Sequence, residues 1–176
     1  MKIRESKGFT LIELLIVVAI IGIIAAIAIP GLLRARMSGN EASAIGSLRA
    51  INSGEAAYSS SCAAGAYAVD LADLVMAPST GGQGFISPDL NVNDVIKSGY
   101  HVNLEPNATP GDDFTGTVCN TPGTTPQSTY YARAEPVTIN STGTRSFATD
   151  VRGTIFFNNT GTAPADPIGS PDTPVQ

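Results

Sequence analysis

The chain has 176 residues, of which 43% are apolar, and its 10 basic and 15 acidic side chains give a formal net charge of −5. This length is enough for one domain and a membrane segment, and the apolar fraction excludes a disordered chain. The basic residues form no long run, so binding of nucleic acid through a broad basic face is not indicated. One histidine and two cysteines are too few for the usual zinc clusters, and no nucleotide-binding or nucleophile motif is present. We therefore expect no enzyme, no metal and no cofactor.

An apolar run covers residues 9–33, where only Thr10 and Glu13 have polar side chains. A membrane-spanning helix needs about 20 apolar residues, so this run is long enough to cross a bilayer. Three basic residues and one acid precede it. The positive-inside rule leaves this end in the cytoplasm and exports the rest of the chain. A carboxylate within a spanning helix is costly, so Glu13 calls for a partner.

Two ordinary interpretations fit this N-terminus in part. A secretory signal also has a basic start and an apolar stretch, and Ala26-Ile27-Ala28 matches its small-x-small cleavage pattern. The apolar stretch of such a signal is shorter, about 7–15 residues, and lacks a carboxylate. A plain membrane anchor accounts for the length but leaves Glu13 unexplained.

The string KGFTLIELL gives a third interpretation, because Gly8 precedes Phe9 and Glu13 is the fifth residue counted from Phe9. This string resembles the type III signal of type IV pilins and pseudopilins. The resemblance covers residues 7–36 almost continuously, and the later string GNEASAIGSLRAINSGEAAY is similar to the helix that follows in these pilins. The resemblance implies that a prepilin peptidase removes the leader, residues 1–8, and N-methylates Phe9. The apolar helix then stays on the mature chain.

The same resemblance implies a role for Glu13 in assembly. Cleavage exposes a positive amine on Phe9, and a neighbouring subunit of a filament presents its amine to Glu13. Desolvation cancels much of the attraction between buried charges, so the pair acts mainly on the axial register of the subunits. The alternative is a carboxylate that is tolerated near the lipid headgroups.

Two residues weaken the predicted helix inside the apolar run. Pro30 has no backbone donor and clashes with the preceding turn, which predicts a kink or a local loss of helix. Gly22 lowers helix propensity, and in filaments of this family the stretch between such positions loses helical structure. For Gly22 a small-xxx-small packing face with Ala26 is an equal alternative.

Residues 34–62 are predicted to continue as an amphipathic helix. Apolar side chains recur on one face at three- and seven-residue intervals, at Ile45, Leu48, Ile51 and Tyr58. Gly65 is the predicted cap beyond the end of the helix.

The globular domain is predicted at residues 63–159. A short helix is expected at 70–76 and a helical turn within 88–97. Four strands follow from alternation and turn signals, at residues 100–105, 128–135, 144–149 and 154–158. The predicted fold class is therefore α+β, with one long helix packed on an antiparallel sheet of roughly four strands.

Single residues of the globular domain carry few functional signals. His101 is expected on the solvent side of its strand. Cys62 and Cys119 are predicted to form a disulfide, since the domain is exported into an oxidising compartment, with two free thiols as the alternative. The Pro- and Gly-rich segment 160–176 is expected to be a loose tail or a surface cover. Its acids Asp166 and Asp172 fall short of the ligands that calcium takes.

The resemblance implies a structural subunit of a type IV pilus. Such a subunit is stored in inner-membrane lipid and is processed by prepilin peptidase. It then polymerises with other copies of itself into a helical surface filament, with an assembly platform and minor pilins as partners. The filament serves adhesion, motility or DNA uptake. A pseudopilin of type II secretion shares the whole signal and is the nearest alternative. An exported binding or enzymatic domain with an ordinary signal is the alternative from another class, and it predicts cleavage after Ala28 rather than after Gly8.

Overall fold

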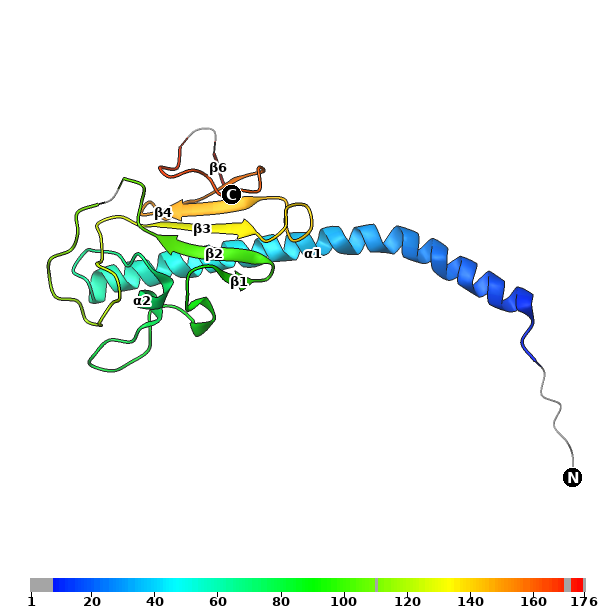
Figure 1. Cartoon of the computed structure of the whole chain (residues 1–176), viewed down its shortest axis with the longest axis horizontal. Helices are drawn as coiled ribbons and strands as arrows, with labels where there is room; N and C mark the ends of the chain where they lie inside the picture. The colour runs from blue at the N-terminus through cyan, green and yellow to red at the C-terminus, as the bar shows by residue number, and fades with distance from the viewer. Residues whose placement is uncertain (1–7, 110, 170–171, 176) are drawn as a thin grey trace, which may run out of the picture. The chain divides into compact units, whose positions relative to one another are not determined.

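A computed structural model describes residues 8–109, 111–169 and 172–175 of the chain. The chain divides into two compact parts, residues 1–36 and residues 37–176, and we call the second part the head. One long helix, α1 (Leu11–Ser61), runs through both parts. The rest of the head contains one short α-helix, one turn of 3₁₀ helix and a single antiparallel sheet (Figure 1). The expected α+β class is confirmed.

The head half of α1 buries one face. Leu48, Ile51 and Tyr58 are fully buried, as their spacing predicted, and Ile45 is partly buried beside them. The helix ends at Ser61, and the chain then turns through positive φ at Ala64 and Gly65; the N–H of Gly65 donates to the carbonyl of Ser59 at 2.9 Å. The hydrogen bond that closes the helix end runs from the N–H of Ala63 to the carbonyl of Tyr58 at 3.0 Å, so Gly65 lies beyond the cap and its predicted capping role is not confirmed.

The sheet has six strands in sequence order, and each strand is antiparallel to its neighbour. The strands are β1 (Val95–Lys97), β2 (Tyr100–Glu105), β3 (Tyr131–Pro136), β4 (Ser146–Asp150), β5 (Ile155–Asn158) and β6 (Thr173–Pro174). Figure 1 shows β2, β3 and β4 lying along the cyan part of α1. The core between helix and sheet joins Leu48, Ile51 and Tyr58 of α1 to Val102 of β2 and Phe147 of β4.

The four predicted strands correspond to β2 through β5, and the two outer strands were not predicted. The expected helical turn within 88–97 is confined to a 3₁₀ helix, Pro88–Leu90, because the chain then extends to pair β1 with β2. The expected helix at 70–76 is α2 (Leu71–Val75), whose N-terminus is capped by the side chain of Asp70.

The C-terminal segment is a surface cover that ends in a strand. Ile168 is buried against Tyr131 and Ala148, on a smaller apolar cluster separate from the main core. The hydroxyl of Tyr131 donates to the carbonyl of Pro164, which fastens the segment to β3. The strand β6 then pairs with β5, so the segment is not a loose tail.

Candidate functional site

The apolar half of α1 exposes its side chains to solvent on every face of the helix. Large apolar side chains of residues 9–33 are 46–86% exposed, and the most apolar stretch of the helix has no buried residue. This helix is long and apolar enough to cross a membrane. A helix that is apolar on every side needs lipid or other protein around it.

The first turn of α1 is closed by a capping box between Thr10 and Glu13. The Glu13 carboxylate accepts hydrogen bonds from the backbone N–H of Thr10 at 2.9 Å and from its hydroxyl at 2.6 Å. The Thr10 hydroxyl oxygen in turn lies 3.3 Å from the backbone nitrogen of Glu13, which donates to it. Reciprocal bonds of this kind satisfy the N–H groups that a helix start leaves free.

This capping role was missed in the sequence, although the signal for it was present. Thr-Leu-Ile-Glu at residues 10–13 has the Thr-x-x-Glu spacing that precedes an apolar helix. The predicted role of Glu13 considered only a partner from another subunit. The structure therefore gives the carboxylate an additional, local function within its own chain.

The predicted cleavage junction lies just before this capping box. Gly8 and Phe9 are exposed and precede the first residue of α1, and Phe9 is 86% exposed. Apart from its chain neighbours, no atom of the described residues lies within 4 Å of the position that a Cβ on Gly8 would take. The described part of the chain therefore leaves space around the junction. Residues 1–7 of the predicted leader lie outside the described residues.

Helix α1 is continuous through both residues that were predicted to weaken it. Gly22 and Pro30 lie inside α1, and the helix does not end at either of them. The predicted loss of helix concerns the subunit in a filament, so it stays a prediction for that state.

A carboxylate network attaches the head half of α1 to the sheet. Glu41 is buried, and its Oε1 accepts from the backbone N–H of Thr144 at 2.9 Å and from the Thr144 hydroxyl at 2.7 Å. Its Oε2 lies 2.7 Å from the guanidinium of Arg145. Burial alone would raise the pKa of Glu41, but the hydrogen bonds from Thr144 and Arg145 and the positive charge of Arg145 hold that pKa below its ordinary value.

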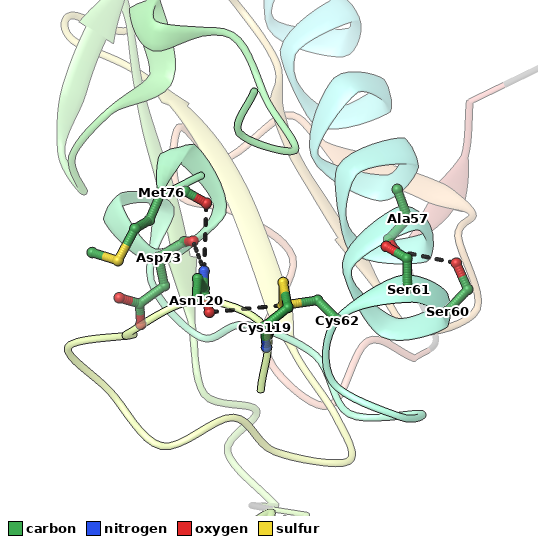
Figure 2. Close-up of a disulfide and its surroundings, with 8 residues drawn as sticks. All are labelled: Ala57, Ser60, Ser61, Cys62, Asp73, Met76, Cys119 and Asn120. Atoms are coloured by element: carbon green, nitrogen blue, oxygen red, sulfur yellow. Dashed lines mark hydrogen bonds between the residues drawn. A yellow bond between two sulfur atoms is a disulfide. The ribbon is translucent and has the colours of Figure 1, made fainter. Parts of the chain in front are cut away.

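The structure contains the disulfide between Cys62 and Cys119, with Cα atoms 4.7 Å apart (Figure 2). The bond joins the residue after α1 to the long segment between β2 and β3. The N–H of Cys119 also donates to the carbonyl of Cys62 at 3.2 Å. Beside the bond, Asn120 donates its side-chain amide to the carbonyl of Asp73 at 3.0 Å, so α2 is held at the same place.

The other candidate residues are not gathered into a reactive site. Within the described residues, no three His, Cys, Asp or Glu side chains come together as metal ligands. His101 lies on β2 with its Nδ1 2.7 Å from the carboxylate of Asp94, and its side chain is 29% exposed. The carboxylate of Asp166 accepts from the backbone N–H of Ala108.

The fold and the N-terminus together define a class of protein: an α+β head on a long helix whose apolar half is suited to a membrane. Residues 3–29 match the family model described as the prokaryotic N-terminal methylation motif. The N-terminal segment of the chain therefore carries this methylation motif.

Three curated relatives match short stretches of the chain. The chain is 66% identical over 38 residues to the type IV wide pilus major component PilA4 of Thermus thermophilus. This match covers 22% of this chain and 29% of that protein. It is 44% identical over 54 residues to the type IV major pilin protein PilA of Myxococcus xanthus, covering 31% and 24% of the two chains. A fimbrial protein of Pseudomonas aeruginosa is 82% identical over 27 residues, or 15% and 18%.

The matches thus span less than a third of each of these relatives. No solved structure matches the chain. The likeness covers less than a third of this chain, and the head is described by its own structure alone.

Proposed function

We propose that this chain is a structural subunit of a type IV pilus. The subunit is stored in the inner membrane as a single-pass precursor, with its N-terminus in the cytoplasm. Prepilin peptidase cuts between Gly8 and Phe9 and methylates the new amine. The mature chains then polymerise with the apolar helices at the filament centre and the heads outside, and they use an assembly platform and minor pilins as partners.

The exposed apolar half of α1 is the observation that carries this proposal. Its large side chains, 46–86% exposed, have two compatible surroundings: hydrocarbon before assembly and neighbouring helices afterwards. The same helix therefore serves as anchor and as assembly element. A type IV pilin needs both functions from one segment, whereas an ordinary signal peptide is removed and leaves the head without an anchor.

In this proposal, Glu13 sets the axial register between neighbouring subunits of the filament. In the precursor, Gly8 still precedes Phe9, so the Phe9 nitrogen is a peptide nitrogen without charge. Cleavage turns it into an amine that can pair with the Glu13 carboxylate of a neighbour. A subunit shifted along the filament axis would leave both charges buried and unpaired, which is strongly unfavourable.

The cut site distinguishes a prepilin from an ordinary exported protein. We expect the intact mass and the N-terminal peptide of the exported chain to start at N-methylated Phe9. Gly8→Val should block this cut, since a side chain at the junction obstructs the peptidase cleft. The matched variant Ala28→Leu alters the signal-peptidase pattern and should be processed normally. A mature chain that starts at Ile29 would refute the proposal.

Imaging distinguishes a pilus from the filament of a type II secretion system, which shares the N-terminal signal. We expect long filaments to be sheared from the cell surface and this chain to be their main component by mass. Two of the similar proteins are named as major pilus components, which favours the pilus. Short periplasmic filaments, together with a secretion defect in the deletion strain, would assign the chain to the pseudopilins instead.

A further inference from the structure

Glu55 is an ionisable side chain inside the apolar core of the head. It lies on α1 and is fully buried, as is Tyr58 less than one turn later. Seven residues separate it from Leu48 and four from Ile51, so the helical period directs it to the same buried face. None of the pilin functions proposed above uses this carboxyl group.

The surroundings of Glu55 provide almost no compensation for a negative charge. Its Oε2 accepts one hydrogen bond, from the backbone N–H of Ala68 at 3.0 Å. Its buried Oε1 has no hydrogen-bond partner among the described residues, and neither does the buried hydroxyl of Tyr58. The described ion pairs of the head all use other acids, so no cation is paired with Glu55.

The titratable groups that face this site are neutral or acidic. Tyr58 lies on the same helix, Asp73 comes from α2, and Tyr130 comes from the segment before β3. Burial raises the pKa of Tyr58 to about 12, and the carboxyl groups of Asp73 and Glu55 add to this rise. The Asp73 carboxylate is satisfied by the N–H groups of Gly123 and Thr124, at 2.6 and 3.1 Å.

We infer that Glu55 is held as the neutral acid and that its proton holds residues 66–70 on helix α1 as a latch, so that loss of the proton as pH rises releases this segment. The neutral acid keeps a carbonyl oxygen for the Ala68 N–H without placing a charge in the core. Ionisation would leave a buried carboxylate with one backbone donor. Burying such a charge costs more free energy than opening the structure around it, so the carboxylate moves into water. The segment that contains Ala68 is the one that donates a hydrogen bond to this carboxyl group.

The direction of the pH dependence follows from the two states of the head. Burial raises the pKa of Glu55 well above its ordinary value, and the Ala68 hydrogen bond offsets only part of this rise. The folded head therefore binds the proton more tightly than the unfolded chain. Its contribution to stability is complete below the ordinary carboxyl pKa and is lost as pH rises through the raised pKa.

Amide hydrogen exchange of the full chain in detergent micelles tests the latch at Ala68 directly. After correction for the intrinsic rate, opening at Ala68 in the wild type should rise by up to about tenfold per pH unit between the ordinary carboxyl pKa and the raised pKa of Glu55, and then level off. Glu55→Gln keeps the shape and the acceptor but cannot ionise, so its corrected exchange should stay flat with pH. Glu105→Gln, which changes an acid of β2 whose side chain is 38% exposed, should keep the wild-type profile.

Two results would overturn the inference. One is a Glu55→Gln profile that rises with pH as in the wild type. The other does not depend on the variant folding: the carboxyl carbon of Glu55, followed by NMR in the isotope-labelled wild-type chain, should titrate well above the ordinary glutamate range. A titration midpoint at or below that range would show that the core holds a carboxylate, and the latch would be excluded.

Discussion

The carboxylate of Glu41 on α1 lies 2.7 Å from the guanidinium of Arg145, the residue that leads into β4, although 104 residues separate them in the chain. The side chain of Glu41 is 8% exposed and that of Arg145 is 35% exposed. Thr144 donates its backbone N–H and its hydroxyl to the same carboxylate. This side chain therefore helps to fix where along α1 the sheet is attached, together with the hydrogen bonds that Asn40 and Asn52 donate to Thr142 and Thr149.

Replacing Glu41 by Ala should destabilise the head by about 2–3 kcal/mol, because it strips partners from Arg145 and from the Thr144 N–H at once. The pKa of Glu41 is lowered in the folded head. The folded state therefore binds this proton less tightly, and the contribution is present above the ordinary carboxyl pKa and lost as pH falls through the lowered pKa. Urea unfolding between pH 3 and 7, followed by tyrosine circular dichroism, measures both effects.

Glu105→Gln is the matched control for Glu41. Glu105 pairs with Arg133 at 2.8 Å, but its side chain is 38% exposed, and Arg133 keeps Glu135 as a second partner. Such surface pairs contribute at most about 1 kcal/mol. Equal losses for Glu41→Ala and Glu105→Gln would show that the buried network does not attach the helix to the sheet.

Replacing Gly54 or Gly46, both on α1, by Ala should change the stability of the head in opposite directions. A Cβ on Gly54 would lie 2.4 Å from Cγ2 of Ile86 and 3.0 Å from the carbonyl oxygen of Phe85, so Gly54→Ala should destabilise the head by roughly 1–3 kcal/mol. A Cβ on Gly46 meets nothing within 4 Å, so Gly46→Ala should stabilise it by about 0.5–1 kcal/mol. Thermal unfolding of the two variants in parallel tests the close approach, and a harmless Gly54→Ala would contradict it.

Loss of the Cys62–Cys119 bond should lower the unfolding free energy by about 4 kcal/mol in the chain-entropy model. The bond closes a loop with a sequence separation of 57 residues. The urea midpoint of the oxidised chain should therefore exceed that of Cys62→Ser/Cys119→Ser. Under reducing conditions the wild type should match the double variant. Two reactive thiols in the denatured, unreduced wild type would mean that the bond does not form in the cell.

The sequence predicted those parts of the fold whose signals are local. Strand β2 (Tyr100–Glu105) has the predicted bounds because six residues alternate between apolar and polar. The two outer strands were missed for the same reason. Strand β1 (Val95–Lys97) has three residues, too few to show a period, and β6 (Thr173–Pro174) contains a proline, which argues against a strand except at an edge.

The candidate sites divide in a similar way. Short strings and composition led to the proposed cleavage junction, to the proposed role of Glu13 and to the cysteine pair, of which the structure contains the disulfide. The pairing of Glu41 with Arg145 was not predictable, since no local pattern links residues so far apart in the chain. The capping role of Glu13 and the burial of Glu55 were both encoded in the sequence, by the Thr-x-x-Glu spacing and by the four-residue step from Ile51.

Variants of Thr10 and Glu13 can separate the capping role of Glu13 in its own helix from its proposed pairing with a neighbour's Phe9 amine. Glu13→Gln retains the capping box, because glutamine serves at that position, but it carries no charge. Thr10→Val removes the hydroxyl that closes the box and leaves the charge. Loss of a cap costs about 1 kcal/mol within each subunit, whereas an unpaired buried amine costs roughly 3–5 kcal/mol at each subunit contact.

We therefore expect Glu13→Gln to be exported and cleaved but to yield almost no filaments, and Thr10→Val to assemble nearly normally. Thr10→Ser keeps the hydroxyl and is the control for the substitution itself. Three amounts are compared in each strain: cleaved subunit, methylated subunit, and subunit in sheared surface filaments. The second amount is needed because the family resemblance also implies that this glutamate assists methylation of Phe9. Filaments lost in Thr10→Val but kept in Glu13→Gln would assign Glu13 to capping alone, and its charge would then have no part in assembly.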